Sequence, residues 1–367
     1  MPRSTTSSPA LNSQAALVPM LGFAVFQIAA ATARLGVPDA IGDGAATAEE
    51  LAATTGADPA ALFRLLRAAA AVGLLTMSDG KKFELTEMGG MFRTDSPVEA
   101  NSLMLLNSAA PIWKAWGGLA DAVRAGETAF DQAYGVGIFD HLEREPELAR
   151  LFHAAMASGT RSQIPQLARH YSFPDAEHII DIGGGNGTHI AAVLEANPRA
   201  RGTVFDTASG ISAAPEVLGR AGVADRCATV AGDFFASVPA GGNVYLLKNI
   251  LVDWDDDSCV RILRNCRTAM TARGRVVVVT TLMPEDIGTQ SASDVLPACI
   301  FDISLMVTVK GRERTLAEYE RLFTQAGLSL SKITRVTPDS ADHTTSLFHI
   351  LEAVPAAHPR QASDGRG

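Results

Sequence analysis

The sequence predicts an α/β protein in which a mainly helical N-terminal domain precedes a doubly wound parallel sheet. Two observations carry this prediction. Residues up to about 100 are rich in Ala and Leu and contain repeated helix-start signals. Beyond residue 176, apolar strand-like runs alternate with helical segments, a pattern that is typical of parallel sheets covered by helices on both faces.

Length and composition narrow the classes of protein that remain. The chain has 367 residues, enough for about two domains, and its 47% hydrophobic content excludes disordered and collagen-like classes. Its net charge is −9, so no nucleic-acid partner is expected, because such a partner requires a basic surface. The four cysteines are too few and too dispersed for a disulfide framework or a zinc cluster, and they indicate reduced thiols in a cytoplasmic protein. These cysteines are Cys227, Cys259, Cys266 and Cys299.

The two chain ends, 1–13 and 356–367, are small polar tails that we expect to be disordered. The stretch from Ala16 to Ala33 carries no charged residue. Pro19 and Gly22 interrupt it, and no basic segment of a signal peptide precedes it. We therefore expect a buried or subunit-interface helix here and no membrane segment.

Residues 14–100 follow the order helix, helix, hairpin, which is that of a winged-helix domain. A capping box beginning at Thr47 starts one helix, and Asp58 followed by Pro59 starts the next. A turn at 78–80 then predicts the hairpin. The second helix carries only two arginines, too few for a DNA-reading surface, so we expect a dimerisation module.

The remaining chain divides into a helical linker at 101–170, which contributes to the substrate region, and the sheet domain at 171–355. Six apolar runs are the predicted strands: 176–182, 203–206, 227–230, 244–247, 276–280 and 346–351. Cys259 and Cys266 share the apolar stripe of one connecting helix, so we expect both in the core and neither on a metal. The acidic run 255–257 indicates the exposed N-terminus of that helix.

The most informative motif is the turn 181–187, Asp-Ile-Gly-Gly-Gly-Asn-Gly, directly after the first strand. Its glycines allow a ligand to approach the backbone closely at the carboxyl end of the sheet. Thr188 stands where a dinucleotide fingerprint has its last glycine, and no P-loop lysine follows. Asp206 ends the next strand, where a carboxylate suits ribose hydroxyls, and Asp233 with Phe234 ends a third, suited to adenine. This pattern predicts an S-adenosylmethionine site; the alternative is a tight turn with two helix-capping aspartates.

Four stretches together resemble one protein family. They are DIGGGNG (181–187), GDFF (232–235), LLKNILVDWDDDSCVRIL (246–263) and GRERTLAEY (311–319). With them, the chain is similar from residue 15 to 353 to the dimeric small-molecule O-methyltransferases, which include plant caffeate-type enzymes and actinomycete enzymes that tailor polyketides. The resemblance implies a Rossmann-like methyltransferase sheet behind a winged-helix dimerisation domain, a homodimer, and methyl transfer from S-adenosylmethionine to a small natural product, with S-adenosylhomocysteine released.

The resemblance also implies roles for individual residues. Those expected to hold the cofactor are Gly183, Gly185, Asp206, Asp233, Phe234 and Lys248. Those expected to contact the substrate are Met156, Asn249, Val252, Phe301, Asp302 and Met306.

The chain departs from this family at the residues that remove the acceptor proton. The family's His-Asp-Trp triplet is Val-Asp-Trp here, with Val252 in place of the histidine, and the first of two supporting glutamates is Thr280. Glu313 retains the second. The candidate catalytic residues are therefore Asp253, Glu313 and His153. Asp253 can orient an acceptor, but it becomes a base only where burial raises its pKa.

The loss of the histidine leaves more than one function open. A general base contributes about 10²–10⁴-fold, and this loss is tolerable where the acceptor is an amine, an acidified phenol, an enol or a carboxylate. Methyl transfer to a hydroxyl is the first hypothesis. The alternative is an enzyme of the same fold that binds S-adenosylmethionine without transferring methyl, of the hydroxylase or pericyclase type. A non-catalytic regulator is the third, which the acidic charge disfavours.

Overall fold

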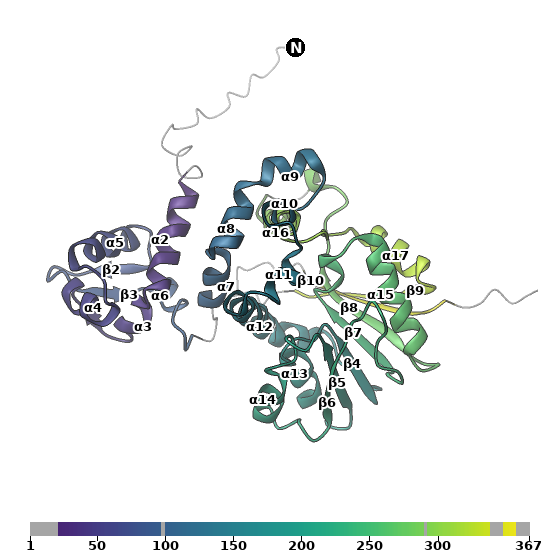
Figure 1. The fold of residues 1–367 in the computed structure, drawn as a ribbon. Helices are drawn as coiled ribbons and strands as arrows, with labels where there is room; N and C mark the ends of the chain where they lie inside the picture. The colour runs from purple at the N-terminus through teal and green to yellow at the C-terminus, as the bar shows by residue number, and fades with distance from the viewer. Residues whose placement is uncertain (1–20, 97–99, 290–291, 338–347, 357–367) are drawn as a thin grey trace, which may run out of the picture. The chain divides into compact units, whose positions relative to one another are not determined.

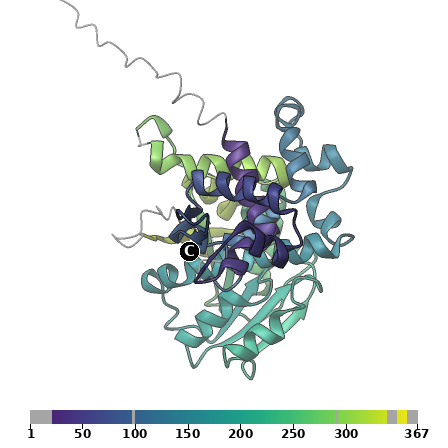
Figure 2. The same ribbon diagram turned by 90° about the vertical axis from the view of Figure 1, so that its left-hand side faces the viewer.

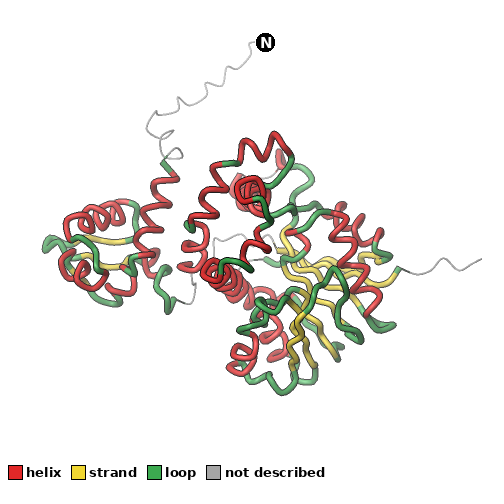
Figure 3. Tube along the Cα trace, in the orientation of Figure 1, coloured by secondary structure: helices red, strands yellow, loops and turns green. Residues whose placement is uncertain are grey.

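The computed structural model describes residues 21–96, 100–289, 292–337 and 348–356. Contacts divide the chain into two compact units, Met1–Ala109 and Ala110–Gly367. The first unit is mostly helical with a small sheet, whereas the second contains a long sheet covered by helices (Figures 1 and 3). None of the described helices is long and apolar enough to cross a membrane.

The first unit forms from local signals of the kind that the sequence shows. Its elements are α2 (Gly22–Arg34), α3 (Val37–Ile41), β1 (Ala45–Ala46), α4 (Ala48–Thr55), α5 (Pro59–Ala71), β2 (Leu75–Met77), β3 (Phe83–Leu85), α6 (Glu87–Gly90) and α7 (Ala100–Asn107). Thr47 and Glu50 form the predicted capping box of α4, and the Asp58 side chain caps α5. The strands pair antiparallel in the order β1-β3-β2. Helix α7 also lies in this unit. The contacts therefore divide the chain after Ala109, whereas the sequence predicts that the first domain ends at residue 100.

The second unit begins with helices and continues as a wound sheet. Its helices are α8 (Ala110–Gly117), α9 (Leu119–Ala125), α10 (Ala129–Tyr134), α11 (Ile138–Leu142), α12 (Pro146–His170), α13 (Thr188–Ala196), α14 (Ala214–Arg220), η1 (Leu251–Asp253), α15 (Asp256–Ala269), η2 (Ile287–Thr289), α16 (Ala292–Thr308) and α17 (Leu316–Gln325). Its strands are β4 (His178–Ile182), β5 (Arg201–Asp206), β6 (Cys227–Ala231), β7 (Val244–Lys248), β8 (Arg275–Thr281), β9 (Leu328–Arg335) and β10 (Phe348–Pro355).

The sheet is mixed, which corrects the prediction of a parallel one. Its order is β6-β5-β4-β7-β8-β10-β9; the pairs from β6 to β8 are parallel, and β10 pairs antiparallel with both β8 and β9. The sequence did not predict β9, because this edge strand is largely exposed and carries no continuous apolar run. The predicted strand 346–351 begins outside the described residues and continues as β10.

The two faces of the sheet carry separate cores. Ile179, Val204 and Val277 pack with α12, α13 and α14 on one face, whereas Ile180 and Val276 pack with α15 and α17 on the other (Figure 1). This division follows from the two-residue alternation of side chains along a strand. The predicted burial of the cysteines of α15 is confirmed, since both have no exposed surface.

The order of the strands determines where a ligand site can form. From β4 the chain moves outward through β5 and β6 on one side, and then returns to the other side for β7 and β8. Open α/β sheets bind ligands at such a reversal, outside the carboxyl ends of the strands. The glycine-rich turn that follows β4 lies at this point of the sheet. Figure 2 shows the same ribbon turned by 90°.

Candidate active site

The turn after β4 has a backbone that only small residues adopt without strain. Gly183 and Gly185 have positive φ angles of 65° and 54°. A Cβ atom on Gly183 would lie 2.4 Å from Ile250 Cδ1, whereas one on Gly185 would meet nothing within 4 Å. The backbone N–H groups of Gly183 and Gly184 both donate to the carbonyl of Phe205 on β5, at 2.8 and 3.3 Å. The turn is therefore anchored to the sheet on one side and open at Gly185.

Asp206 ends β5 beside this open position. Its Oδ2 accepts a hydrogen bond from the Gly185 N–H at 2.8 Å, and its Oδ1 accepts one from the Thr207 N–H at 2.6 Å. An ionised carboxylate has about four acceptor positions, so both oxygens keep capacity for further donors. Such a fixed carboxylate suits a pair of ribose hydroxyls.

His153, on α12, belongs to the same end of the sheet. Burial lowers the pKa of its imidazole, and the negative charge of Asp206 opposes this shift. His153 therefore interacts electrostatically with Asp206, and its part in catalysis stays a prediction.

An aromatic cluster surrounds the loop after β6. The exposed Asp233 accepts a hydrogen bond from the Phe235 N–H at 2.8 Å, and the Phe234 ring meets the Trp254 ring edge-on at 5.8 Å. Trp254 also stacks on Phe139 of α11 at 5.3 Å. The sequence placed Phe234 in the cofactor site but did not identify Phe139, because helix α11 lies far from the strand motifs along the chain.

Three ionisable side chains lie at the turn and at the end of β7. Asp181 is 2% exposed, and its Oδ2 has no hydrogen-bond partner. Burial raises its pKa to about 7, with a smaller contribution from Asp206, and burial lowers the pKa of Lys248 to about 8. The pKa of the buried His189 falls to about 3, first through burial and then through the charge of Lys248. Lys248 therefore supplies a cation at the cofactor side of the sheet.

The turn after β7 carries three of the predicted site residues, Asn249, Val252 and Asp253. Asn249 has a positive φ of 53°, and its N–H donates to the Val279 carbonyl at 2.9 Å. Val252 in η1 is 1% exposed, so its side chain is packed and contributes no proton transfer. Asp253 is half-buried, and burial raises its pKa to about 7. This shift meets the condition under which a carboxylate can act as a base.

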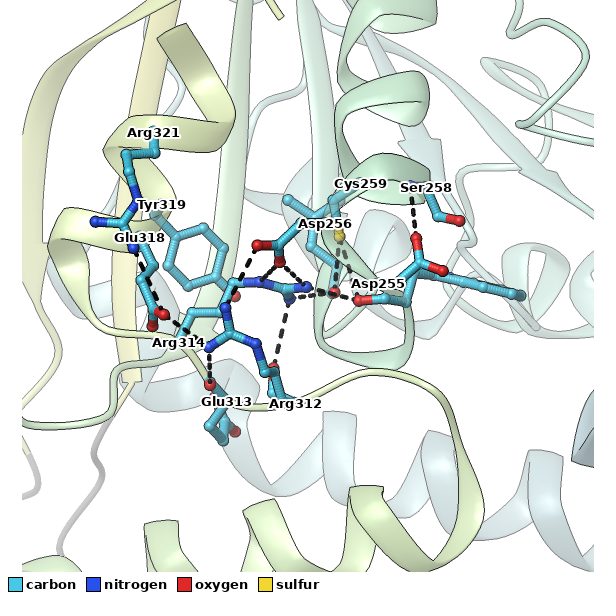
Figure 4. Close-up of polar contacts among 12 residues, drawn as sticks. Asp255, Asp256, Ser258, Cys259, Arg312, Glu313, Arg314, Glu318, Tyr319 and Arg321 are labelled. Atoms are coloured by element: carbon cyan, nitrogen blue, oxygen red, sulfur yellow. Dashed lines mark hydrogen bonds and ion pairs between the residues drawn. The ribbon is translucent and has the colours of Figure 1, made fainter. Parts of the chain in front are cut away.

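Arg314 holds this turn in place. The guanidinium has no solvent exposure; Nη1 donates to the Leu251 carbonyl at 2.8 Å and Nη2 to the Trp254 carbonyl at 2.7 Å, at the two ends of η1. Nε donates to Asp256 at the start of α15, at 2.9 Å. Figure 4 shows these contacts converging on one side chain. The sequence analysis included Arg314 in the GRERTLAEY stretch without assigning it a role.

Thr280 stands where the resemblance leads us to expect the first supporting glutamate. It is 1% exposed, and its hydroxyl forms a 2.8 Å hydrogen bond with the Tyr319 hydroxyl and donates to the Thr281 carbonyl at 3.2 Å. Its hydrogen-bonding capacity is therefore used inside the core formed by β8 and α17.

Three carboxylates come together on the acceptor side. The backbone N–H of Glu313 donates to Oδ1 of Asp302 on α16 at 2.8 Å, and Asp253 and Asp302 both raise the pKa of Glu313 electrostatically. Glu313 is 3% exposed, and neither of its carboxylate oxygens has a hydrogen-bond partner. Burial is the main cause that raises its pKa to about 8. We call Asp253, Asp302 and Glu313 the acidic cluster.

The adjoining glycine explains why the cluster forms. A Cβ atom on Gly311 would lie 1.8 Å from the Val252 carbonyl oxygen, so the segment leading to Glu313 passes directly against the backbone of η1. The segment after β8 is also tied to Arg314, because the Met283 N–H donates to its carbonyl at 3.0 Å. Only a residue without a side chain allows this contact.

The remaining predicted substrate residues lie on two helices. Met156 on α12 is 46% exposed, Phe301 on α16 is 41% exposed, and Met306 on α16 is half-buried. Exposed apolar side chains of this size are available to an apolar ligand. Their contact with a substrate stays a prediction.

The predicted site residues thus fall into two groups. We call the glycine turn, Asp206, the loop after β6 and Lys248 the cofactor side, and the acidic cluster the acceptor side; which ligand each group contacts stays a prediction. The described residues contain no group of three or more His, Cys, Asp or Glu side chains arranged to hold a metal ion.

Comparisons with known proteins identify the family of the chain. Residues 116–329 match the O-methyltransferase domain, and residues 19–95 match the O-methyltransferase dimerisation domain. The chain is 36% identical to the phenazine O-methyltransferase PhzM of Lysobacter antibioticus, across 91% of this chain and 94% of that protein. The solved structure of the mitomycin 7-O-methyltransferase MmcR has a TM-score of 0.85 at 34% identity, covering 95% of this chain and 98% of that one. A 32% identical relative is the aclacinomycin 10-hydroxylase RdmB of Streptomyces purpurascens, across 91% of this chain and 89% of that protein.

We expect Arg314→Lys to destabilise the fold. A lysine keeps the charge but lacks the planar fork, so the carbonyls of Leu251 and Trp254 lose their donors. Leaving buried acceptors unsatisfied should lower the free energy of unfolding by about 1–3 kcal/mol, measured by denaturant titration. Arg321→Lys is the matched control, because its side chain is 62% exposed, and it should change stability by less than about 0.5 kcal/mol. Equal effects of the two substitutions would contradict the role of Arg314.

Glu313 should make stability depend on pH. Its pKa rises from 4.5 to about 8 on folding, so between these values the folded chain keeps a proton that the unfolded chain has lost. The stability contributed by this proton is complete below pH 4.5 and is lost as the pH rises to about 8. We expect the unfolding free energy of Glu313→Gln to fall less over this range than that of the wild type. Glu320→Gln, an exposed carboxylate on α17, should keep the wild-type slope.

Proposed function

Because the chain belongs to the O-methyltransferase family that carries an N-terminal dimerisation domain, we propose that it methylates a hydroxyl of a small natural product. S-adenosylmethionine is the methyl donor, and S-adenosylhomocysteine is released. The observation that carries this proposal is the glycine turn anchored to β5 beside Asp206, opposite a carboxylate, Asp253, whose pKa lies near neutrality. We also propose that the enzyme is a cytoplasmic homodimer with a winged-helix N-terminal domain.

The residues at the cofactor side fit S-adenosylmethionine. The space at Gly185 lies next to the Asp206 carboxylate, which would take the ribose hydroxyls. Asp233 and Phe234 follow β6, where they would contact the adenine amine and ring. Gly183 and Lys248 would adjoin the methionine part. When bound, S-adenosylmethionine supplies an electrophilic methyl group on a positively charged sulfur.

The chain must then remove a proton from the acceptor. We propose that Asp253 accepts this proton. Its pKa is raised to about 7, whereas a solvated carboxylate titrates near 4, so Asp253 is better matched to a phenol, whose pKa is about 10. Val252 and Thr280 cannot do so, since both are packed in the core. Asn249, one turn earlier, can orient the acceptor through its side-chain amide. His153 interacts electrostatically with Asp206, so we assign it a ligand contact and not the base.

Labelled cofactor tests the function directly. Purified protein would be incubated with methyl-deuterated S-adenosylmethionine and an extract of small metabolites from the source cells, and products would be followed by mass spectrometry. We expect a labelled metabolite together with an equal amount of S-adenosylhomocysteine. A metabolite that changes only when the cofactor is present, but carries no label, would contradict methyl transfer and favour a reaction of the hydroxylase type.

We expect Asp253→Asn to lower kcat by about 10²–10⁴-fold and to leave S-adenosylhomocysteine affinity unchanged. In the wild type, kcat/KM should rise with pH through about 7, because the carboxylate must be deprotonated to accept a proton, and this rise should disappear in Asp253→Asn. Asp257→Asn, an exposed aspartate of α15, is the matched control and should behave as wild type. A pH profile that Asp253→Asn leaves unchanged would exclude Asp253 as the base.

A further inference from the structure

The acidic cluster has three carboxyl groups, more than proton removal by one base requires. Asp253, Asp302 and Glu313 come from η1, α16 and the segment before α17. Asp302 accepts a hydrogen bond from the Glu313 backbone N–H, and Asp253 and Asp302 each act electrostatically on Glu313. We propose that this cluster binds a basic nitrogen of the acceptor, so that the substrate is an amine-bearing small molecule whose hydroxyl is methylated beside Asp253. This inference rests on the proposed function and specifies its substrate class.

Glu313 is the side chain that points to a missing cation. It is 97% buried, and both of its carboxylate oxygens lack a partner. In Figure 4 it points away from the ion pairs around Arg314, and no dashed line meets its carboxylate. A buried carboxylate without a donor is unfavourable, because it has lost water without gaining a hydrogen bond. An ammonium group would supply both the donors and the opposite charge.

Neither arginine beside Glu313 forms an ion pair with it, although the charge of Arg314 lowers the pKa of Glu313 against the larger effect of burial. Arg312 pairs with Glu318 at 2.9 Å and lies 3.4 Å from Asp256. Arg314 pairs with Asp256 at 2.8 Å and donates its other N–H groups to backbone carbonyls. Across the part of the chain that the structure describes, no ion pair reaches the acidic cluster.

The electrostatic character of the acceptor side favours a cationic ligand. The charge of Arg314 lowers the pKa of Glu313 less than burial raises it, and no cation of the described residues forms an ion pair with the acidic cluster. Among acceptors that need no strong base, a carboxylate would be repelled by this cluster, whereas a molecule bearing an ammonium group would be attracted.

The two halves of the acceptor then have separate partners. The ammonium group donates to Asp302 and Glu313, and it stays protonated, so it is not the methylated atom. The hydroxyl group loses its proton to Asp253 as its oxygen forms the new bond to the methyl carbon. Recognition of the nitrogen also places the hydroxyl, because both groups belong to one rigid molecule.

A matched pair of probes tests this proposal. Tyramine and 4-ethylphenol share a phenol and differ by an amine, which is protonated at about pH 8 because alkyl amines titrate near 10. Each would be titrated calorimetrically into the dimer saturated with S-adenosylhomocysteine. We expect tyramine to bind about 10–100-fold more tightly than 4-ethylphenol, the range of a charge-assisted hydrogen bond to a buried carboxylate. In Glu313→Gln this preference should shrink to within about threefold.

Two further variants make the outcome decisive. Glu320→Gln removes one exposed negative charge and should keep the full tyramine preference, which separates local recognition from net charge. Asp302→Asn should lose part of it. The proposal is overturned if tyramine binds no better than 4-ethylphenol, whatever their affinities. It is also overturned if Glu313→Gln keeps the preference for tyramine. S-adenosylhomocysteine titration and the labelled-methyl assay test the proposed function separately, so failure of the amine preference alone leaves methyl transfer intact.

Discussion

The acceptor side of this protein depends on one buried guanidinium. Arg314 bonds the carbonyls at both ends of η1 and the aspartate that opens α15, so the turn bearing Asp253 cannot move independently of the segment bearing Glu313. Gly311 permits the close approach that these bonds need. Because Arg314 donates to structural acceptors, it forms no ion pair with Glu313, and its charge lowers the pKa of Glu313 less than burial raises it.

Burial brings the pKa values of several carboxylates toward neutrality in this site. Asp181 and Asp253 reach about 7 and Glu313 about 8, in each case chiefly through loss of hydration. The consequences differ because the surroundings differ. Near Asp181, Lys248 supplies a positive charge that favours the ionised carboxylate. Near Glu313, Arg314 acts in the same direction without forming an ion pair, and in our proposal the acceptor supplies that pair.

Two residues stand where the resemblance leads us to expect a histidine and a glutamate, and both are packed. Val252 fills the core, and Thr280 bonds Tyr319. Neither side chain can therefore remove a proton from an acceptor. In the proposed mechanism Asp253, a carboxylate of raised pKa, is the base, and the acidic cluster binds the ammonium group of the acceptor.

The sequence by itself determined the features that depend on neighbouring residues: the capping box at Thr47, the cap at Asp58, the glycine turn after β4 and the five parallel strands, since each is set by local conformational preference or by alternation along one segment. It did not determine the antiparallel edge, because β9 is exposed and lacks an apolar run. Only the tertiary structure decided which side chains meet. Asp253, Asp302 and Glu313 belong to separate segments, and their contact, the isolation of Glu313 and the position of Arg314 result from packing between those segments, which no spacing along the chain encodes.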